Sequence, residues 1–425
     1  MTLQNIVIAG AGIIGNSVAY YLVRNYPHLD LSITLIDPVG ICPAASAKAG
    51  GFLAKDWRDG SNVQELHRLG FDLHEQLSHE LEGTDYRRLT ALNVAVDGNL
   101  SRKHNSKKVP TTEWLDENVV LGSMEMGTED NIAQVHPKKL CDRMWEFSES
   151  KGVKLEIGKV VEAIMSPEED SGSVDPEIRA VRLEDGSVIQ CSVLVIATGP
   201  WTEEIYSWFP KTNHFEAALA FLPPIQGVKS HSMLVKTERV LNQAVFFESN
   251  DSINDIEVYP RPDGDSYITG SSLKVLKMVE RPGEEAVEPK LEEELLDAMR
   301  RTSSTVLGGR EPHTVQACYW PETPDGMPVI GPLPNMRGVL IGTGHSVWGI
   351  LQGPATGLVI AEFLAGESVS INLEPLGLGQ GRMDFMTTMG SGYDNFGDGS
   401  GGSFEDFYGG NFEDFYGMDD GLVWE

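Results

Sequence analysis

A glycine-rich turn between two short apolar strands constrains this chain more than any other feature. Residues 5–9 (NIVIA) are predicted to form a buried strand, and the turn GAGIIG follows directly at 10–15. An apolar-periodic helix is predicted over 13–25, and LSITLID at 31–37 is predicted to form a second strand. This strand–turn–helix–strand order is typical of a parallel sheet with a right-handed crossover. We therefore expect an α/β fold built on a Rossmann-type unit.

The three glycines of this turn have separate physical roles. Gly10 permits the tight turn, Gly12 lets backbone N–H groups approach a pyrophosphate, and Gly15 lets the helix pack closely on the strand. The helix N-terminus adds the partial positive charge that favours phosphate. Asp37 ends the second strand, where its carboxylate can accept a hydrogen bond from a ribose 2′-hydroxyl. The unit predicts a dinucleotide site, and the alternative is a glycine turn that serves packing alone.

The rest of the chain interleaves two kinds of segment. Residues 1–88, 136–212 and 323–375 show α/β patterns, including the apolar strand SVLVIATG and the strand–turn–helix sequence at 338–366. Residues 89–135 and 213–322 show strand-like alternation, with a charged helix predicted over about 290–306. The first set is assigned to a nucleotide-binding domain, and the second to a strand-rich α+β domain that interrupts it twice.

Composition and charge exclude several classes of partner. Asp and Glu number 63 against 33 Lys and Arg, which gives a net charge of -30. Because so acidic a chain repels phosphate backbones and anionic lipid, we expect no nucleic-acid partner. No apolar run approaches the roughly 20 residues of a membrane span, so we expect no transmembrane segment. The first residues show no basic n-region, so we expect no signal peptide either. The basic loop at 97–111 is interpreted as solvated surface.

The four cysteines predict neither a disulfide framework nor a zinc site. Cys42, Cys141, Cys191 and Cys318 are scattered and form no CxxC pair. The expectation is therefore a reduced, metal-free protein in the cytoplasm.

The last 50 residues differ from the rest in composition. Residues 376–425 hold ten acidic residues, one Arg and 13 of the 45 glycines, and the segment SFEDFYGG at 403–410 is nearly repeated as NFEDFYGM at 411–418. A disordered acidic tail is expected, because such a segment buries too little apolar surface to fold. The alternative is that the two aromatic–acidic copies dock an unknown protein.

Four segments together resemble one known family. They are GAGIIG with Asp37, ASAKAGGFLA at 45–54, VLVIATGPW at 193–201, and TPDGMPVIGP with GTGHSVWG at 323–332 and 342–349. In order and spacing the chain is similar to the D-amino-acid-oxidase-like FAD-dependent oxidoreductases, which include glycine oxidase and sarcosine oxidase. It is most similar to a poorly characterised eukaryotic subset with an AGGFLA-type loop. FAD is therefore the expected cofactor. A two-nucleotide reductase is less favoured, because no second GxGxxG follows a strand.

The resemblance and the loop chemistry together give the expected cofactor residues. The 45–51 loop offers small residues and backbone donors to a planar ring, although a plain connecting loop is the alternative. The helix after Gly344 would direct its N-terminus at the pyrimidine side of the flavin and stabilise negative charge there. The full set is Gly10, Ala11, Gly12, Ile13, Ile14, Gly15, Asp37, Pro38, Ser46, Ala47, Lys48, Gly50, Gly51, Val161, Ala197, Thr198, Gly199, Trp201, Gly344, His345, Ser346 and Gly349.

The resemblance implies that the strand-rich segments, 89–135 and 213–322, form the substrate domain, and the catalytic candidates come from them and from the 345 turn. They are His345, Tyr259, Tyr319 and Arg261. The alternative for His345 is a structural role, and for Arg261 a place at the surface. Trp57 and Trp348 are candidates for the pocket wall, against plain core packing.

The family pattern also marks departures in this chain. Amino-acid oxidases of the family commonly carry a carboxylate-binding Arg where this chain has Trp320, which places a simple α-amino-acid substrate in doubt. Cys318 stands where sarcosine oxidases attach flavin covalently, although a plain buried thiol is the alternative. The oxygen-activating lysine of those enzymes aligns near Ile268.

The expected reaction is oxidation of a C–N bond in an amine or amino-acid-like substrate. A hydride would pass to flavin N5, the imine would hydrolyse, and oxygen or another acceptor would take the electrons. The alternatives are an FAD-dependent 2-hydroxy-acid dehydrogenase and a flavin-bound regulatory or docking protein with little turnover.

Overall fold

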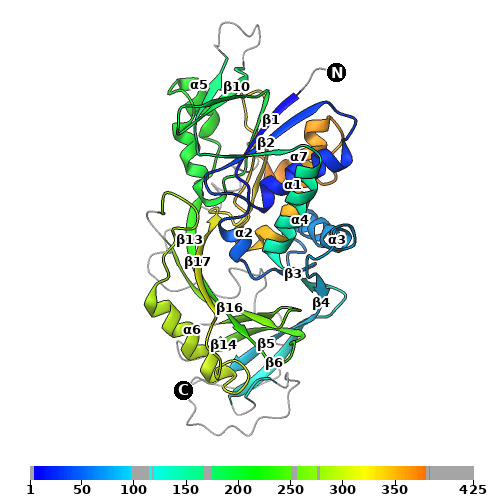
Figure 1. Cartoon of the computed structure of the whole chain (residues 1–425), viewed down its shortest axis with the longest axis vertical. Coiled ribbons are helices and arrows are strands. Elements are labelled where there is room, and N and C mark those ends of the chain that lie inside the picture. The colour runs from blue at the N-terminus through cyan, green and yellow to red at the C-terminus, as the bar shows by residue number, and fades with distance from the viewer. Residues whose placement is uncertain are drawn as a thin grey trace.

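The computed structural model describes residues 4–96, 114–116, 119–166, 175–249, 256–274, 278–379 and 382. The basic loop predicted at 97–111 lies outside these residues, and so does nearly all of the predicted tail, including both aromatic–acidic copies. The described chain forms two halves along its long axis, each built around one large sheet (Figure 1).

A six-stranded sheet lies in the first half. Its strands, in spatial order, are β18 (Val329–Pro332), β19 (Val339–Thr343), β12 (Val193–Ile196), β1 (Gln4–Ala9), β2 (Leu31–Asp37) and β8 (Lys154–Ile157). Only β18 pairs antiparallel, and the other five strands are parallel. The central strand β1 buries Ile8 in one core and Val7 in another, as a parallel strand covered on both faces must.

A layer of helices packs on one face of this sheet. The helices are α1 (Ile13–Asn25), α3 (Gln64–Glu80), α4 (Pro137–Ser150) and α7 (Gly349–Ala365). Helices α1 and α7 approach closely because α7 carries glycine at the contact. A Cβ at Gly357 would lie 2.2 Å from Ser17 Cβ. Helix α3 had no counterpart in the sequence predictions.

The expectation that no apolar run reaches the length of a membrane span is wrong. Among the described residues, one helical stretch, Ser346–Ala365, is long and apolar enough by composition, but 72% of its most apolar window is buried inside the protein. Its apolar side chains pack on the sheet and on α1, as those of a core helix do.

The opposite face of the six-stranded sheet carries a smaller layer. It contains β9 (Val160–Met165), β10 (Ile178–Leu183), β11 (Val188–Gln190), the 3-10 helix η1 (Gly199–Ser207) and α5 (Asn213–Leu219). Residues 213–275 were expected to be strand-like, and α5 corrects the start of that range. Its buried residues Phe215, Ala218 and Leu219 have the i, i+3, i+4 spacing of one helix face.

A seven-stranded sheet forms the second half. Its strands, in spatial order, are β17 (Thr314–Glu322), β13 (Gln226–Lys236), β16 (Asp265–Lys274), β15 (Glu257–Pro260), β14 (Gln243–Ser249), β5 (Thr90–Val96) and β6 (Val120–Gly127). Helix α6 (Pro289–Thr302) packs on one face through Leu295 and Met299, which join a core with Ile268 and Val258. The other face is directed at the first half, as Figure 1 shows.

Short elements complete the fold. They are α2 (Ala45–Lys48), β3 (Phe52–Ala54), β4 (Arg87–Arg88), β7 (Ile132–Gln134), η2 (Ser346–Trp348) and η3 (Glu374–Leu376). The predicted α/β class with interleaved strand-rich segments is confirmed, because each large sheet draws strands from separate parts of the chain. The domain boundaries by residue number stay a prediction.

Two residues from the segment assigned to the tail are buried in the first half. Leu376 is buried, and the Arg382 guanidinium lies 2.9 Å from Asp325 Oδ1 and also donates to the carbonyls of Met327 and Pro328. The folded part of the chain therefore extends past residue 376.

The cysteine prediction is wrong in one respect. Cys42 and Cys141 form a disulfide with their Cα atoms 6.6 Å apart, while Cys191 and Cys318 are free and buried. The residues are 99 positions apart, so spacing gave no signal. The disulfide removes the cysteine argument for a reducing compartment, and the cytoplasmic location stays a prediction.

Candidate active site

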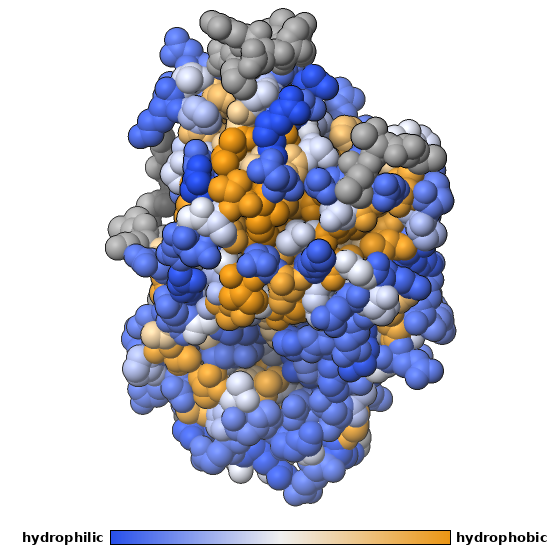
Figure 2. Space-filling model, turned by 45° about the horizontal axis from the view of Figure 1, so that its top comes forward, coloured by the Kyte–Doolittle hydropathy of each residue, from blue (hydrophilic) through white to orange (hydrophobic). Residues whose placement is uncertain are grey.

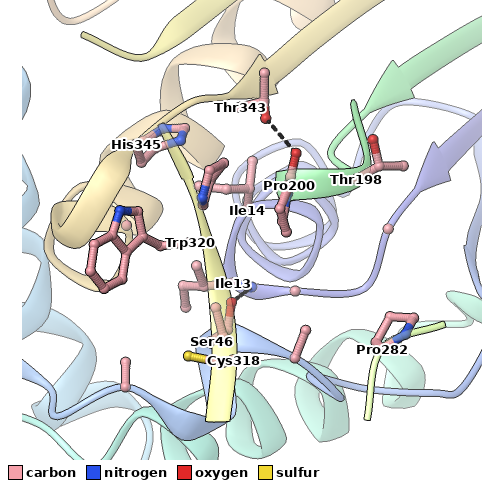
Figure 3. Close-up of a pocket in the computed structure, with 18 of the residues that line it drawn as sticks. Ile13, Ile14, Ser46, Thr198, Pro200, Pro282, Cys318, Trp320, Thr343 and His345 are labelled. Atoms are coloured by element: carbon pink, nitrogen blue, oxygen red, sulfur yellow. Dashed lines mark hydrogen bonds between the residues drawn. The ribbon is translucent and has the colours of Figure 1, made fainter. Parts of the chain in front are cut away.

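One continuous cavity runs between the carboxyl ends of the β1, β2 and β12 strands and the inner face of the seven-stranded sheet. It is lined by the 9–14 turn, the end of β2, residues 43–52, the 197–201 turn and residues 342–350, together with residues of β13, β15, β16 and β17. Figure 3 shows Ile13 and Ser46 at one side and His345 and Trp320 at another. Segments from the two ends of the sequence therefore share one pocket.

The glycines at the start of α1 have the geometry that a phosphate turn requires. Gly10 has φ +104°, and a Cβ there would lie 2.2 Å from the Ala197 carbonyl oxygen. A Cβ at Gly15 would lie 2.0 Å from the Gly10 carbonyl oxygen. By contrast, a Cβ at Gly12 would meet only Ser46 Oγ within 4 Å, so Gly12 is open to the cavity. The Ile13 N–H donates to that Oγ at 3.0 Å (Figure 3), which ties the helix start to α2.

Asp37 supports the backbone around the same turn. Its Oδ2 accepts from the Ala11 N–H at 3.1 Å, and its Oδ1 accepts from the N–H groups of Val39 and Gly40 at 2.9 and 3.1 Å. Burial raises the pKa of this carboxyl, and the three backbone donors oppose that rise. Asp37 also lines the cavity, so it both fixes the turn and faces the position expected for a ribose.

Val161 does not line the cavity, and its neighbour Val160 does. On β9 the Val161 side chain is 37% exposed, whereas Val160 is buried and lines the pocket beside Gly158 and Lys159. Neighbouring side chains on a strand point to opposite faces, so Val160 and not Val161 faces the cavity. A contact between this strand and the adenine stays a prediction.

Lys48 holds the two halves together. Its Nζ lies 2.8 Å from Glu285 Oε2 and donates to the Ala317 carbonyl at 2.8 Å. The Glu285 side chain is fully buried. Lys48 and Ala47 do not line the cavity, while Ser46, Gly50 and Gly51 do. The 45–51 loop thus presents backbone and small side chains to the cavity and directs its one charge at the other half.

The disulfide fixes the wall next to this loop. Cys42 precedes the lining residues Pro43 and Ala44, and its N–H donates to the Ala11 carbonyl at 3.0 Å. The disulfide joins this segment to α4 through Cys141.

The 344–349 turn places His345 at the cavity wall. Gly344 has φ +75°, which favours glycine, and the imidazole is buried with Nε2 2.8 Å from Thr356 Oγ1 on α7. Burial lowers the pKa of His345 to about 3, so the ring is neutral near pH 7. Ser346, Trp348 and Gly349 also line the cavity, where α7 begins, whereas Gly344 does not.

Strand β17 presents alternate residues to the cavity. Cys318 and Trp320 line it (Figure 3), while Tyr319 lies on the other side of the strand and its ring packs 6.4 Å from that of Trp201. Burial raises the pKa of Cys318 to about 12, so it is a thiol near pH 7. The structure therefore places Tyr319 behind the wall.

An aromatic stack packs against the 45–51 loop and closes that side of the cavity. The Tyr259 ring stacks on Tyr267 at 5.9 Å and on Phe52 at 5.2 Å. A Cβ at Gly50 would lie 2.3 Å from Tyr259 Cδ2, so glycine is what lets the stack approach the loop. Trp57 packs against Phe52 at 5.2 Å and does not line the cavity.

Arg261 is buried and does not line the cavity. Its Nη2 donates to the Ala49 carbonyl at 3.2 Å, its Nη1 lies 3.4 Å from His136 Nε2, and its guanidinium carbon lies 5.6 Å from the Tyr267 ring centre. The alternative of a surface position is wrong, and Arg261 supports the aromatic stack from behind.

The remaining predicted cofactor residues divide between lining and supporting positions. Of the full predicted set, Ala11, Gly15, Ala47, Lys48, Val161 and Gly344 do not line the cavity, and the others do. Cofactor contacts by the lining residues stay a prediction.

Sequence reasoning missed several lining residues. Glu257, Thr269 and Ser230 line the cavity from β15, β16 and β13, and Thr343 donates to the Gly199 carbonyl at 3.1 Å beside it. Strand alternation puts Glu257 and Tyr259 on one face of β15, but it does not show which face meets the cavity.

Comparisons with known proteins identify the family. The model for the family DAO, FAD dependent oxidoreductase, matches residues 5–363, so the chain belongs to this family. The Schizosaccharomyces pombe protein C1F5.03c, named as a candidate oxidoreductase, is 29% identical over 399 residues, which cover 88% of this chain and 97% of that protein. Glycine oxidase of Bacillus licheniformis is 24% identical over 388 residues, covering 85% of this chain and 93% of that protein.

A solved structure shows the same fold. Glycine oxidase from Geobacillus kaustophilus has a TM-score of 0.69 at 17% identity and covers 89% of this chain and 99% of its own. The chain is thus an FAD-dependent oxidoreductase, and FAD is its cofactor. The cavity fits FAD. It has an open glycine at one helix start, an acidic side chain at the end of β2, and a second helix start near His345.

Proposed function

We propose that this enzyme oxidises a C–N bond in an amine or amino-acid-like substrate. The observation that carries the proposal is the single cavity that joins the 10–15 turn, the 344–349 turn and the inner face of the seven-stranded sheet. An extended dinucleotide would lie along the two turns, and the inner face of the sheet would leave room for a substrate beside the flavin ring. Relatives named glycine oxidase support a C–N donor.

Bound FAD would supply the hydride acceptor, its N5, for the substrate carbon that carries the nitrogen. The imine product would then hydrolyse. The backbone at 10–15 and Asp37 would hold the pyrophosphate and the ribose. The start of α7, next to His345, would stabilise negative charge at the far end of the ring.

The chain's own contribution is orientation and exclusion of water. The aromatic stack with Trp320 and Trp348 would hold the donor C–H against the ring in a largely apolar space. His345 is neutral and hydrogen-bonded to Thr356, so it is suited to hold a fixed hydrogen-bond geometry and not to carry a charge. No residue needs to act as a base if the amine reaches the ring neutral.

Anaerobic mixing of the purified FAD-loaded enzyme with amines, amino acids and 2-hydroxy acids tests the proposal. We expect amine or amino-acid-like compounds to bleach the oxidised flavin band and hydroxy acids to leave it unchanged. Bleaching by hydroxy acids alone would contradict the proposal in favour of a C–OH donor. An absence of bleaching by the whole panel would contradict it in favour of a binding role.

A further inference from the structure

We infer that residues 278–288 form a strap over the nucleotide half of bound FAD, so that the strand-rich half supplies one wall of the cofactor site. The strap lies between β16 and α6 in the chain, and none of its residues belongs to a helix or strand. The inference concerns the cofactor and does not depend on which substrate the enzyme oxidises. It follows from where the strap meets the cavity and from the contacts that hold it.

Two residues of the strap line the cavity. They are Glu280, which is exposed, and Pro282, which is buried. Figure 3 shows Pro282 on the side of the cavity away from His345 and Trp320. Because the flavin ring is expected near His345, the strap meets the end of the cavity where the nucleotide would lie.

The first part of the strap is held by the wall of the first half. The Trp201 indole Nε1 donates to the Val279 carbonyl at 2.9 Å, and Trp201 itself lines the cavity. The Arg281 guanidinium pairs with Glu184. The Glu184 N–H in turn donates to the carbonyl of the cavity residue Lys159 at 2.9 Å. The strap is therefore tied to cavity-lining residues directly or through one backbone hydrogen bond.

The end of the strap is held by the strand-rich half. Glu288 pairs with Lys229 of β13 at 2.7 Å, and its N–H donates to His231 Nε2 at 3.0 Å. Between the two ends, the buried Glu285 carboxylate pairs with Lys48 of α2 at 2.8 Å. The strap is thus fixed to both halves, and Glu280 and Pro282 lie where it passes the cavity.

The strap and a bound nucleotide are expected to stabilise each other. Irregular backbone held by a few side chains opens locally more easily than the strands of a packed sheet. A nucleotide that contacts only the closed strap lowers the population of the open strap as its concentration rises above its Kd. ADP should therefore act as FAD does, and FMN, which lacks the adenosine, should not.

A protease that cleaves after glutamate reports the opening of the strap. The wild-type apoprotein is digested alone and with saturating FAD, ADP or FMN, and the fragments are identified by mass spectrometry. Glu280 and Glu284 are exposed sites in the strap, and Glu129, exposed in the turn between β6 and β7 and outside the cavity, is the control site. We expect FAD and ADP to slow cleavage in the strap at least about tenfold, with a smaller change at Glu129.

Three results of this digestion would overturn the inference. Equal slowing in the strap and at Glu129 would show stabilisation of the whole protein and not of the strap. Protection by FMN as strong as that by ADP would place the strap at the flavin end. Unchanged cleavage in the strap with FAD or with ADP would show that the strap does not cover the nucleotide.

A pair of proline variants tests the contact with the cofactor. Pro282→Ala trims the ring that lines the cavity, and Pro210→Ala changes an exposed proline outside it. FAD release is followed by flavin fluorescence after dilution of the loaded protein, and circular dichroism confirms that each variant is folded. We expect release to be about threefold faster or more for Pro282→Ala and unchanged for Pro210→Ala. Equal rates in the two variants would overturn the contact, and the digestion of the wild type does not depend on either variant.

Discussion

Lys48 Nζ and Glu285 Oε2, 237 positions apart, lie 2.8 Å apart and join the 45–51 loop to the strand-rich half. The Glu285 side chain is fully buried and the Lys48 side chain is partly buried, with exposures of 0% and 19%. The same ammonium donates to the Ala317 carbonyl, next to the cavity residue Cys318. The position of the loop that would support the flavin therefore depends on a contact with the substrate side.

Removing one partner of this pair is expected to destabilise the protein. Lys48→Met leaves the Glu285 charge buried, and we expect a loss of about 3 kcal/mol in the free energy of unfolding. The double variant Lys48→Met with Glu285→Gln should recover part of that loss, because no charge is left unpaired. Urea unfolding followed by circular dichroism measures both. A single variant as stable as the wild type would contradict the assigned role.

Gly50→Ala should weaken FAD binding. A Cβ at this position would lie 2.3 Å from Tyr259, so the loop or the aromatic stack must move. We expect a loss of FAD affinity of about tenfold or more, measured by titration of the apoprotein, because a small displacement of a binding loop costs that much. Gly122→Ala is the control, since a Cβ there meets nothing within 4 Å. Equal losses in the two variants would show that the close approach is unimportant.

Acidification should unfold the protein through its buried histidines. Burial lowers the pKa of His345 and of His67 to about 3, and that of His74 to about 4. In the unfolded chain the pKa of each of these histidines is about 6.5. Between the folded-state and unfolded-state pKa values, the unfolded chain binds more protons than the folded protein. The stabilisation is therefore complete above about pH 6.5 and is lost as the pH falls toward the folded-state pKa values.

The contribution of His345 can be isolated. Each such histidine contributes at most about 1.4 kcal/mol per pH unit. His345→Gln should therefore give a shallower fall in stability between about pH 6.5 and 4, as measured by urea unfolding across that range. A slope identical to that of the wild type would mean that His345 is protonated in the folded protein.

Two truncations test where the folded chain ends. Arg382 and Asp325 have side-chain exposures of 1% and 2%. Ending the chain after residue 384 keeps this pair, and ending it after residue 379 leaves Asp325 buried without it. We expect the shorter chain to lose about 3 kcal/mol relative to the longer one, by urea unfolding. Equal stability of the two truncated chains would place Arg382 outside the structural core.

FAD should be released from the protein by acid precipitation. The Cys318 pKa is raised to about 12, so near pH 7 the group is a thiol and not the thiolate that attacks a ring. We predict a yellow supernatant for the wild type and for Cys318→Ser. A yellow pellet in the wild type that Cys318→Ser abolishes would show a covalent link.

Local patterns were sufficient for the Rossmann unit. The helix predicted at 13–25 and the strand predicted at 31–37 match α1 and β2, because apolar periodicity and the glycine turn act over a few residues. Gly10 and Gly15 were assigned their roles for the same reason. Helix α3 was missed because its buried residues include His67, Gly70 and His74, which weakens the apolar pattern.

Contacts between distant segments could not be predicted. Neither the Cys42–Cys141 disulfide nor the Lys48–Glu285 pair has a signal in spacing, since each depends on how two separate elements pack. On strands, the sequence pattern did not show that Val160 lines the cavity in place of Val161, or which face carries Tyr319. Glu257 was missed because a single acidic residue in a strand pattern is usually solvent-exposed.

Titration of the apoprotein with FAD in the presence and absence of ADP tests the central claim most directly. If the 10–15 turn and the 344–349 turn hold opposite ends of one molecule, one FAD should bind per chain, and ADP should compete with it at the first turn. Binding of FAD that ADP does not affect, or no binding of FAD at all, would contradict the account.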